Sequence, residues 1–318
     1  MKYIVLSTDN GYVQHCATTL TSISQNNPNT FFYILTEGLE DKNANLLRNL
    51  ARENKCDLEV LTVSKEFIDK VPMPDDKALS HISPATYYRL LISSLLPESV
   101  EKVVYMDCDI IVRKSLDKLF DIDLSNYALG AVFQDDPTLL QGDEQSRLGL
   151  TAEQGYFNAG VLVMNLIYWR QNNVEEKLLD FMANNYNNIR FHDQDVLNAV
   201  LGKNTLAISC NWNMLTVFLT RALNNFTSER CVNYRKEVQS GIGKDPAVVH
   251  FVYRPKPWEW SCVHPFKSEY YKYLDKTPFK GWRPKATLDY ASIRERMINM
   301  WPFNHLSFLN PKAIFVKY

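Results

Sequence analysis

The alternation of short apolar runs with helical patterns in the first hundred residues constrains the fold most. Apolar runs that predict strands cover residues 3–8, 30–36, 58–63 and 102–106. Segments with helical spacing separate them, at residues 12–25, 40–54 and 83–96. Strands joined by helical crossovers form a mostly parallel, twisted, Rossmann-like sheet with helices on both faces, so we predict an α/β fold of this kind.

The rest of the chain continues the pattern less regularly. We predict strands at residues 127–133 and 159–166, a helix at 173–186, and a late strand that begins at 248 and leaves into a Pro-rich turn. The polar residues 134–155 indicate a long loop with a short helix. Ser83 followed by Pro84 predicts a capped helix start.

Two aspartates follow the apolar strand 102–106 with one residue between them. Asp107 and Asp109 therefore lie at the carboxyl ends of the strands, where parallel sheets bind ligands, and Asp9 follows the first strand to the same rim. Paired carboxylates suit Mg²⁺ or Mn²⁺, which can bridge to substrate phosphates and supply the missing counter-charge. The alternative is a solvated turn with two unrelated aspartates.

Several common motifs of nucleotide-binding and hydrolase sites are absent from the sequence. The chain has no GxGxxG fingerprint, no GxxxxGK[ST] loop and no GxSxG elbow. These absences argue against dinucleotide binding, P-loop phosphoryl transfer and α/β-hydrolase chemistry, and leave a metal and phosphate site.

Four segments in this order give the chain a recognisable character. They are "VVYMDCDIIV" (103–112), "YFNAGVLVMNLIYWR" (156–170), "HDQDVLNAVL" (192–201) and "HFVYRPKPW" (250–258). Together they resemble glycosyltransferase family 8, the retaining GT-A enzymes that include bacterial lipopolysaccharide galactosyl- and glucosyltransferases. The resemblance covers about residues 1–262.

The resemblance implies a metal site and a diphosphate site. Asp107, Asp109 and His250 match the ligands of Mn²⁺ (or Mg²⁺), and Lys256 matches the lysine that holds the diphosphate; Cys108, between the aspartates, would line the donor site. Without the resemblance, a lone histidine after a strand is more often packed or solvated, and Lys256 reads as a loop lysine.

The resemblance also implies the donor pocket. Residues expected to contact the UDP-sugar are Ser7, Thr8, Asp9, Tyr12, His81, Arg89, Asn158 and Ala159. The first three would face uridine, and Tyr12 could stack on the base. Gly160 would allow close backbone approach to the sugar. From the residues alone, Asp9 reads as a turn former, and His81 and Arg89 as helix-surface residues.

The expected catalytic residues lie in "HDQD". Asp193 would hold sugar hydroxyls, and Gln194 would lie on the face opposite the leaving group, while Asp195 and Asn198 would hold the loop. Because glutamine is a poor nucleophile, we favour front-face substitution over a double displacement through Asp193. The sequence departs from the family pattern at Tyr253, where relatives have glycine, which puts the acceptor side of the site in question.

The charge of the chain is uneven. Residues 266–318 hold ten Lys or Arg against four Asp or Glu, and 12 of the 39 aromatic residues, although the whole chain has a net charge of −1. We predict a catalytic domain at 1–265 and a helical, basic and aromatic segment at 266–318 that contacts an anionic membrane or packs on the domain. Nucleic acid is not an expected partner.

These features together predict a metal-dependent transferase that moves galactose or glucose from a UDP-sugar to a glycan or glycolipid acceptor in lipopolysaccharide or other surface-glycan synthesis. The six scattered cysteines and the absence of a signal-peptide pattern favour a cytoplasmic protein with reduced thiols, resting on the inner face of the plasma membrane. The alternatives are a sugar-nucleotide-binding relative without activity and a metal-dependent nucleotidyltransferase or phosphodiesterase.

Overall fold

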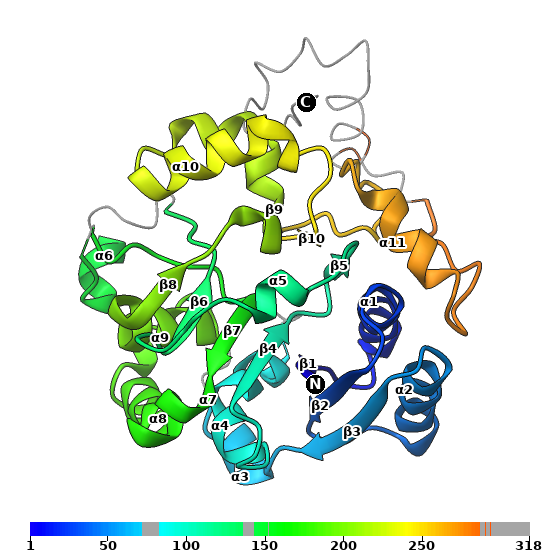
Figure 1. Ribbon diagram of the computed structural model, residues 1–318, viewed down its shortest axis with the longest axis horizontal. Coiled ribbons are helices and arrows are strands. Elements are labelled where there is room, and N and C mark those ends of the chain that lie inside the picture. The colour runs from blue at the N-terminus through cyan, green and yellow to red at the C-terminus, as the bar shows by residue number, and fades with distance from the viewer. Residues whose placement is uncertain (72–82, 136–142, 152, 287–289, 291–292, 294–318) are drawn as a thin grey trace.

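The computed structural model describes residues 1–71, 83–135, 143–151, 153–286, 290 and 293. Its main sheet has the strand order β3-β2-β1-β4-β7-β6-β8 (Figure 1). The bounds of these strands are β1 Lys2–Ser7, β2 Thr30–Thr36, β3 Asp57–Thr62, β4 Lys102–Met106, β6 Leu129–Ala131, β7 Val161–Asn165 and β8 Thr205–Ala207. All run parallel except β7, which is antiparallel to β4 and β6. The predicted mostly parallel sheet is confirmed.

The strand order reverses at β1. The chain places β2 and β3 on one side of β1 and then returns to place β4 on the other side. In open α/β sheets such a reversal leaves a crevice beyond the carboxyl ends of the two strands that flank it. Here those ends lead into Thr8 and Asp107.

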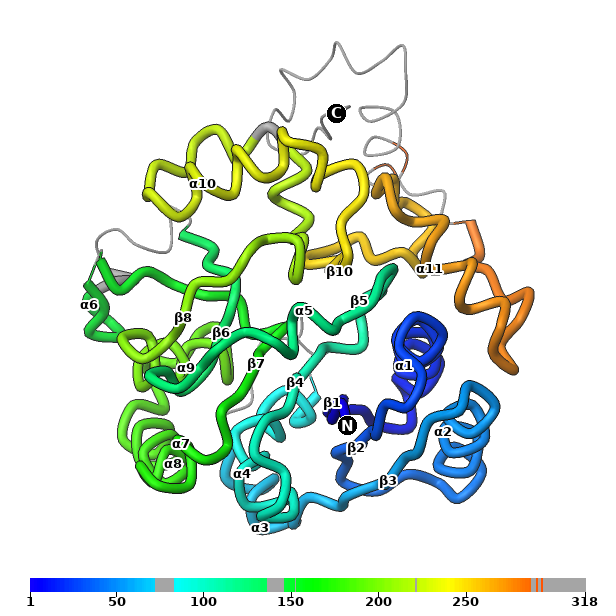
Figure 2. Tube along the Cα trace, viewed as in Figure 1, coloured from blue at the N-terminus to red at the C-terminus, as the bar shows by residue number. Residues whose placement is uncertain are grey.

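A second, three-stranded sheet has the order β5-β10-β9, with β5 at Ile110–Val112, β9 at Met214–Leu215 and β10 at Val248–His250. Strand β10 runs antiparallel to β5, and His250 pairs with Ile110. Figure 2 shows these two segments, far apart in the sequence, lying side by side. This register places His250 beside Asp109; the family motifs paired these two residues as metal ligands, but the pairing of β10 with β5 was not predicted.

Helices cover both faces of the main sheet, as predicted. The α-helices are α1 Val13–Asn26, α2 Asp41–Glu53, α3 Lys65–Ile68, α4 Ile92–Leu95, α5 Asp117–Phe120, α6 Asp143–Leu148, α7 Leu166–Gln171, α8 Val174–Asn184, α9 His192–Leu201, α10 Glu229–Glu237 and α11 Lys267–Leu274. The 3₁₀ turns are η2 Pro84–Leu91, η3 Tyr186–Asn188, η4 Gly202–Asn204, η5 Cys210–Trp212, η6 Thr216–Leu219 and η7 Arg221–Asn225, and η8 Val238–Ile242 is a π-helical turn.

The helix predicted at 83–96 begins as expected but differs in type. The Ser83 hydroxyl accepts from the Ala85 N–H at 3.3 Å, and Pro84 occupies the first helical position. The segment then forms the 3₁₀ helix η2 and only four residues of α-helix. Because a 3₁₀ helix has three residues per turn, Thr86 and Arg89 lie on one edge, and both face the crevice.

Three predicted strands are shorter than expected. Residues 127–133 contribute only β6, and residues 159–166 only β7. The late strand ends at His250, because the N–H of Val252 bonds the His250 carbonyl at 2.9 Å in a three-residue turn. Side chains after His250 therefore leave the sheet and can enclose the crevice.

The described part of the C-terminal segment packs on the domain. Helix α11 lies beside α1, and its Tyr270, Tyr273 and Leu274 are buried against Val249 and Phe251 near the second sheet (Figure 1). No helix among the described residues is long and apolar enough to cross a bilayer. All six cysteines are buried and free, in accord with the predicted reduced thiols.

Candidate active site

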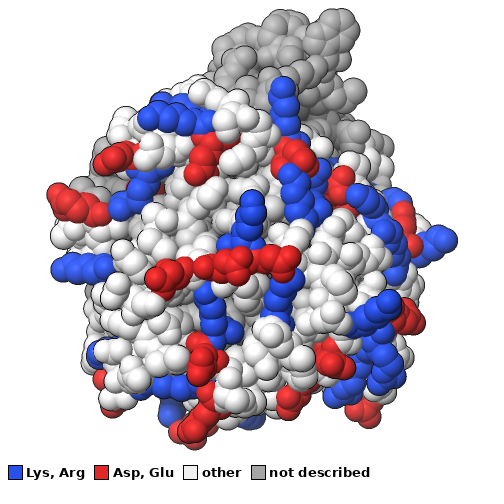
Figure 3. All heavy atoms as spheres, viewed as in Figure 1, with Lys and Arg blue, Asp and Glu red and all other residues white. Residues whose placement is uncertain are grey.

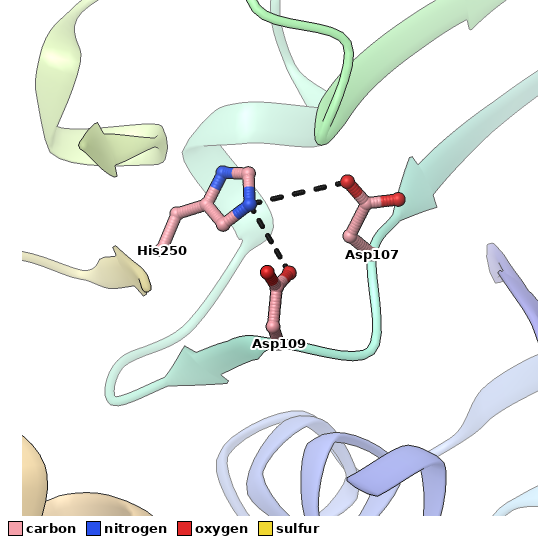
Figure 4. A group of neighbouring side chains, drawn as sticks. All are labelled: Asp107, Asp109 and His250. Carbon is pink, nitrogen blue, oxygen red and sulfur yellow. Dashed lines mark ion pairs between the residues drawn. The ribbon is translucent and has the colours of Figure 1, made fainter. Parts of the chain in front are cut away.

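Three side chains converge at the crevice between β1 and β4. Asp107 and Asp109 come from the turn between β4 and β5, and His250 comes from the end of β10 (Figure 4). Nε2 of His250 lies 3.1 Å from Oδ1 of Asp109 and 3.9 Å from Oδ2 of Asp107. One ligand atom from each residue lies within 4.8 Å of the other two. The predicted triad is therefore brought together.

The chemistry of this triad fits a divalent cation. Oδ1 of Asp109 is buried and has no hydrogen-bond partner among the described residues, although Nε2 of His250 is 3.1 Å away. Adjacent ligands of an octahedral ion with bonds of about 2.1 Å are separated by about 3 Å. Two carboxylates and one imidazole suit Mg²⁺ or Mn²⁺.

Neighbouring donors orient Asp107 toward this point. Its Oδ1 accepts hydrogen bonds from Arg89 Nη2 at 2.8 Å and from the Tyr105 hydroxyl at 2.9 Å. Its backbone N–H donates to the Gly160 carbonyl at 2.9 Å. With Oδ1 occupied, Oδ2 is the oxygen that faces His250.

Lys256 brings a positive charge to Asp109, on the side of the triad away from Arg89. Its Nζ donates to Asp109 Oδ2 and to the Phe251 carbonyl, both at 2.6 Å. Burial alone would raise the pKa of Asp109, but the Lys256 ammonium, with a smaller contribution from the neighbouring His250, holds that pKa well below its usual range. Lys256 therefore pairs with Asp109 here, next to the expected diphosphate position.

The triad lies where two cavities meet, of about 360 and about 530 Å³. The first is lined by the end of β1, the turn that leads to α1, and Trp258. The second is lined by residues 158–160, just before β7, and by the start of α9. The residues shared by both cavities are Thr86, Arg89, Asp107, Asp109 and Lys256.

The smaller cavity contains the residues predicted to bind uridine. Ser7, Thr8, Asp9, Tyr12 and Cys108 all line it. Asp9 Oδ1 accepts from the Tyr12 N–H at 2.9 Å, which closes the turn between β1 and α1. The Ser7 hydroxyl is buried without a partner among the described residues. Cys108 Sγ donates to the Ser7 carbonyl at 3.2 Å, so the thiol supports this wall from behind.

An aromatic group closes this cavity on the side of α11. The Trp258 ring stacks on His15 at 3.7 Å and meets Tyr12 edge-on at 5.7 Å. His15 Nδ1 lies 2.7 Å from the Tyr270 hydroxyl. Burial lowers the pKa of His15 to about 3, so the ring is neutral and packs as an aromatic residue.

Arg89 lies between two carboxylates in the floor shared by the cavities. Its Nη2 contacts Asp107, and its Nε lies 2.9 Å from Asp193 Oδ2, while Nη1 donates to the Ala159 carbonyl at 2.6 Å. Burial by itself would lower the pKa of the Arg89 guanidinium. The carboxylates of Asp107 and Asp193 raise that pKa by a larger amount, so Arg89 stays charged. The donor contact predicted for Arg89 would therefore come from a guanidinium that is already bound to these two carboxylates.

Asp193 is buried in the wall of the larger cavity. The Thr86 hydroxyl donates to its Oδ1. The Nε–H of Arg89 is directed at the Thr86 carbonyl, so Asp193 Oδ2 has no hydrogen-bond donor among the described residues. Burial raises the pKa of Asp193 to about 6, with Arg89 opposing it.

The segment Asn158–Gly160 forms the wall next to Asp193. Gln194 Oε1 accepts from Asn158 Nδ2 at 3.2 Å and from the Ala159 N–H at 3.0 Å. A Cβ at Gly160 would overlap the His250 ring and lie 3.0 Å from Asp107 Oδ2. We predicted that this glycine admits the sugar; the observed close neighbour is the histidine.

Asp195 holds the loop before α9, as predicted, whereas Asn198 connects α9 to Phe157 instead. Asp195 Oδ2 accepts from the N–H groups of Arg190 and Phe191 at 2.8 Å and from Arg147 at 2.7 Å. Asn198 makes two hydrogen bonds of 2.8 Å to the backbone of Phe157.

Four residues that hydrogen-bond to side chains of the site were not identified from the sequence. They are Tyr105, Thr86, Asn213, which contacts His250, and Gln134, which contacts Tyr253. Tyr105 precedes Asp107 by two residues on β4, so strand alternation could have indicated it. Thr86 could have been found only with the 3₁₀ geometry, and Asn213 and Gln134 carried no signal. His81 lies outside the described residues.

Tyr253, the position at which the family pattern predicts glycine, borders the larger cavity. Its φ is +68°, a left-handed conformation that favours glycine, and the side chain is 56% exposed. Gln134 Nε2 donates to its hydroxyl at 2.5 Å. The backbone at this position therefore keeps a glycine-like conformation, and the Tyr253 ring occupies the rim of the cavity.

The sheet, the switch at β1 and the acidic turn after β4 define the GT-A fold. The crystal structure of galactosyltransferase LgtC in complex with donor and acceptor sugar analogues matches this structure with a TM-score of 0.74 at 22% identity, covering 92% of this chain and 99% of that chain. The family model for glycosyl transferase family 8 matches residues 3–262, and the chain belongs to this family.

Curated relatives extend over most of the chain. They include general stress protein A of Bacillus subtilis, 27% identical over 86% of this chain and 93% of that protein. Another is the lipopolysaccharide 1,2-glucosyltransferase of Escherichia coli, 25% identical over 95% of this chain and 86% of that protein. Family membership implies glycosyl transfer from a nucleotide sugar, with a divalent metal ion.

Proposed function

We propose that this protein is a metal-dependent, retaining hexosyltransferase that moves galactose or glucose from a UDP-sugar to a hydroxyl of a glycan acceptor. The observation that carries the proposal is the convergence of Asp107, Asp109 and His250 at the junction of two cavities. A cation there would touch the leaving diphosphate, with the nucleotide in one cavity and the sugar and acceptor in the other.

The smaller cavity supports the assignment of the nucleotide. The Ser7 hydroxyl, which has no hydrogen-bond partner within the described ranges, and the carboxylate of Asp9 offer polar contacts to a base and ribose, and Tyr12 offers a ring face. Lys256 lies between this cavity and the triad, so it can transfer its hydrogen bond from Asp109 to a diphosphate oxygen. Mn²⁺ or Mg²⁺, when bound, would supply positive charge for the leaving diphosphate.

The larger cavity supports transfer on the face from which the diphosphate leaves. The Gln194 carbonyl oxygen already accepts two hydrogen bonds, and an amide is a poor nucleophile. Asp193 is ion-paired with Arg89, which makes it a weak nucleophile, but its Oδ2 can accept a sugar hydroxyl. Both contacts favour front-face substitution over a covalent sugar on Asp193.

The acceptor is proposed from the relatives. Among them are a lipopolysaccharide 1,2-glucosyltransferase of Escherichia coli and a lipopolysaccharide 1,3-galactosyltransferase of Salmonella typhimurium, the latter 21% identical over 87% of this chain. We infer a lipopolysaccharide or other surface-glycan acceptor, which would enter over the Tyr253 side of the larger cavity.

The test is release of UDP from a panel of UDP-sugars in the presence of Mn²⁺ and without acceptor. Slow hydrolysis of UDP-galactose or UDP-glucose, abolished by EDTA, is the expected result. Release of UMP or pyrophosphate would instead identify a phosphodiesterase or nucleotidyltransferase. Binding of UDP without any turnover would identify an inactive sugar-nucleotide-binding relative.

We further propose that residues 266–318 bring the catalytic domain, residues 1–265, to an anionic membrane surface. Between Phe266 and Ala286 there are six Lys or Arg and two Asp or Glu, and Lys272, Lys276 and Lys280 are exposed. Lys and Arg side chains, with Asp and Glu among them, lie on the right of Figure 3, the side on which α2 and α11 lie in Figure 1. Each such charge near anionic lipid contributes about 1 kcal/mol.

Charge variants of the whole chain test this contact better than truncation, because α11 is part of the core. Replacing Lys272, Lys276 and Lys280 with Gln should weaken flotation with phosphatidylglycerol vesicles on the order of 100-fold. The matched control replaces the exposed Lys177, Lys203 and Lys236 on other elements. Equal flotation of both variants would remove the proposed membrane contact.

A further inference from the structure

We propose that Asn213 is a positioning residue that fixes one tautomer of His250, with the hydrogen on Nδ1 and the lone pair of Nε2 aimed at Asp107 and Asp109. Asn213 lies before β9, on a segment that no sequence motif marks, and it is fully buried. The inference rests on the proposed metal site, because it concerns how one of its ligands is prepared.

The polarity of the hydrogen-bond chain begins at the backbone. The Gly160 N–H donates to Asn158 Oδ1 at 3.0 Å, and a backbone N–H can only donate, so this atom is the carbonyl oxygen. The same oxygen accepts from Asn213 Nδ2 at 2.9 Å. The other end of the Asn213 amide, its oxygen, therefore faces His250.

A second backbone group gives the same polarity independently. The Ala159 N–H donates to Gln194 Oε1 at 3.0 Å, which identifies that atom as an oxygen. The Asn158 atom facing it, at 3.2 Å, must then be the amide nitrogen. Two backbone donors thus fix the orientation of Asn158, and through it the orientation of Asn213.

The last link sets the tautomer. Asn213 Oδ1 lies 2.9 Å from His250 Nδ1, and an amide oxygen has no hydrogen to donate, so Nδ1 carries the hydrogen. Nε2 then presents a lone pair to Asp109 Oδ1, 3.1 Å away, an oxygen to which no group in the described part of the chain donates a hydrogen bond. The opposite tautomer would place an N–H at that point and obstruct a cation.

Burial makes this control effective. Asn158, Asn213 and His250 are each no more than 5% exposed, so water does not compete for their hydrogen bonds. A Cβ at position 160 would overlap the His250 ring, so the glycine is what lets the ring pack at this place. Metal-binding histidines generally depend on such a partner at the second nitrogen, and its loss lowers metal affinity by about 10–100-fold.

The first experiment needs no metal. In the metal-free protein with ¹⁵N-labelled histidine, long-range ¹H–¹⁵N spectra distinguish a protonated ring nitrogen from one with a lone pair. At a pH where the ring carries a single proton, we expect the hydrogen of His250 on Nδ1; a His250→Gln variant assigns the signal. A hydrogen on Nε2 in the wild-type protein would overturn the proposal.

The second experiment measures the affinity for Mn²⁺, alone and with UDP, in three variants. Asn213→Leu should weaken binding by about 10–100-fold. Asn213→Asp keeps an acceptor for Nδ1–H but loses the hydrogen bond to Asn158 Oδ1, so its affinity should lie between those of Asn213→Leu and the wild type. Asn211→Leu is the control, because Asn211 lies two residues before Asn213 on the same segment. Its Oδ1 accepts a hydrogen bond from the Ala247 N–H and not from His250. We expect it to bind Mn²⁺ normally.

The outcomes separate the two proposals. Equal Mn²⁺ affinity of Asn213→Leu and wild type would overturn the role of Asn213. A wild-type protein that binds no Mn²⁺ would contradict the proposed metal dependence, and the tautomer measurement would still decide the role of Asn213. If Asn213→Leu does not fold, the tautomer in the wild-type spectrum and the Mn²⁺ affinity of Asn213→Asp still test the role of Asn213.

Discussion

Asp107 and Asp109 are separated by one residue, yet their surroundings differ. Asp107 shares the fully buried guanidinium of Arg89 with Asp193, and backbone carbonyls hold that guanidinium in place. Asp109 is paired with Lys256, whose flexible side chain reaches it from the loop after β10. The comparison indicates that the Arg89 side is a fixed part of the structure, while the Lys256 side can exchange one cation for another.

The largest expected effect comes from removing the exchangeable carboxylate. Asp109→Ala should lower Mn²⁺-dependent UDP release by about 1000-fold, since the cation contributes several kcal/mol to the leaving group. The fold should persist, because Asp109 borders both cavities, so water can take the place of its carboxylate beside Lys256. The exposed Asp57→Ala variant is the control. Activity of Asp109→Ala within a few-fold of wild type would contradict the metal site.

On the fixed side, Arg89→Met should act mainly on stability. It leaves the carboxylates of Asp107 and Asp193 in the interior without their cation, which costs about 3–5 kcal/mol in the free energy of unfolding. Urea denaturation measures this loss, with the exposed Arg48→Met as control. A loss below about 1 kcal/mol would show that the two sides do not differ as proposed.

The variants Asp193→Asn and Gln194→Ala separate the two walls of the larger cavity. We expect Asp193→Asn to lower turnover by about 100-fold, because it removes the acceptor for a sugar hydroxyl, and Gln194→Ala by about 10-fold. Steady-state UDP release measures both. A covalent sugar trapped on Asp193 and detected by mass spectrometry would replace front-face substitution with double displacement.

Lys256→Met tests whether Lys256 and a metal ion compete for Asp109. Without the lysine, Asp109 is free for metal, so the affinity for Mn²⁺ in the absence of nucleotide should rise several-fold. The KM for the UDP-sugar should rise about 10-fold, because a charge-assisted hydrogen bond to the diphosphate is lost. The exposed Lys276→Met is the control. An unchanged KM would remove Lys256 from the diphosphate site.

The smallest effect is a pH dependence. Burial raises the pKa of Asp193 to about 6, so its carboxylate becomes protonated as the pH falls through 6. The protonated group can no longer accept hydrogen bonds from both the Thr86 hydroxyl and a sugar hydroxyl. UDP release should therefore decline on the acid side with an apparent pKa near 6. The residual activity of Asp193→Asn should lack this decline; its persistence would assign the pKa to another group.

Sequence reasoning was most successful where the structure is locally determined. The first four strands, the acidic turn after β4 and the capped start at Ser83 follow from patterns within a few residues. Family motifs indicated His250 and Lys256, whose roles remain proposals, although the structure places both beside Asp109. The 3₁₀ form of η2 was missed, because its type depends on packing against neighbouring elements.

By itself, the sequence determined the parallel half of the sheet and the presence of carboxylates at its rim, because strand alternation and turn signals are local. Tertiary structure alone decided the pairing of β10 with β5, the ion pairs of Arg89, and the contact of Asn213 with His250. These contacts join residues far apart in the chain, where no periodic pattern specifies a partner. Their geometry is set only when the buried polar groups must satisfy one another.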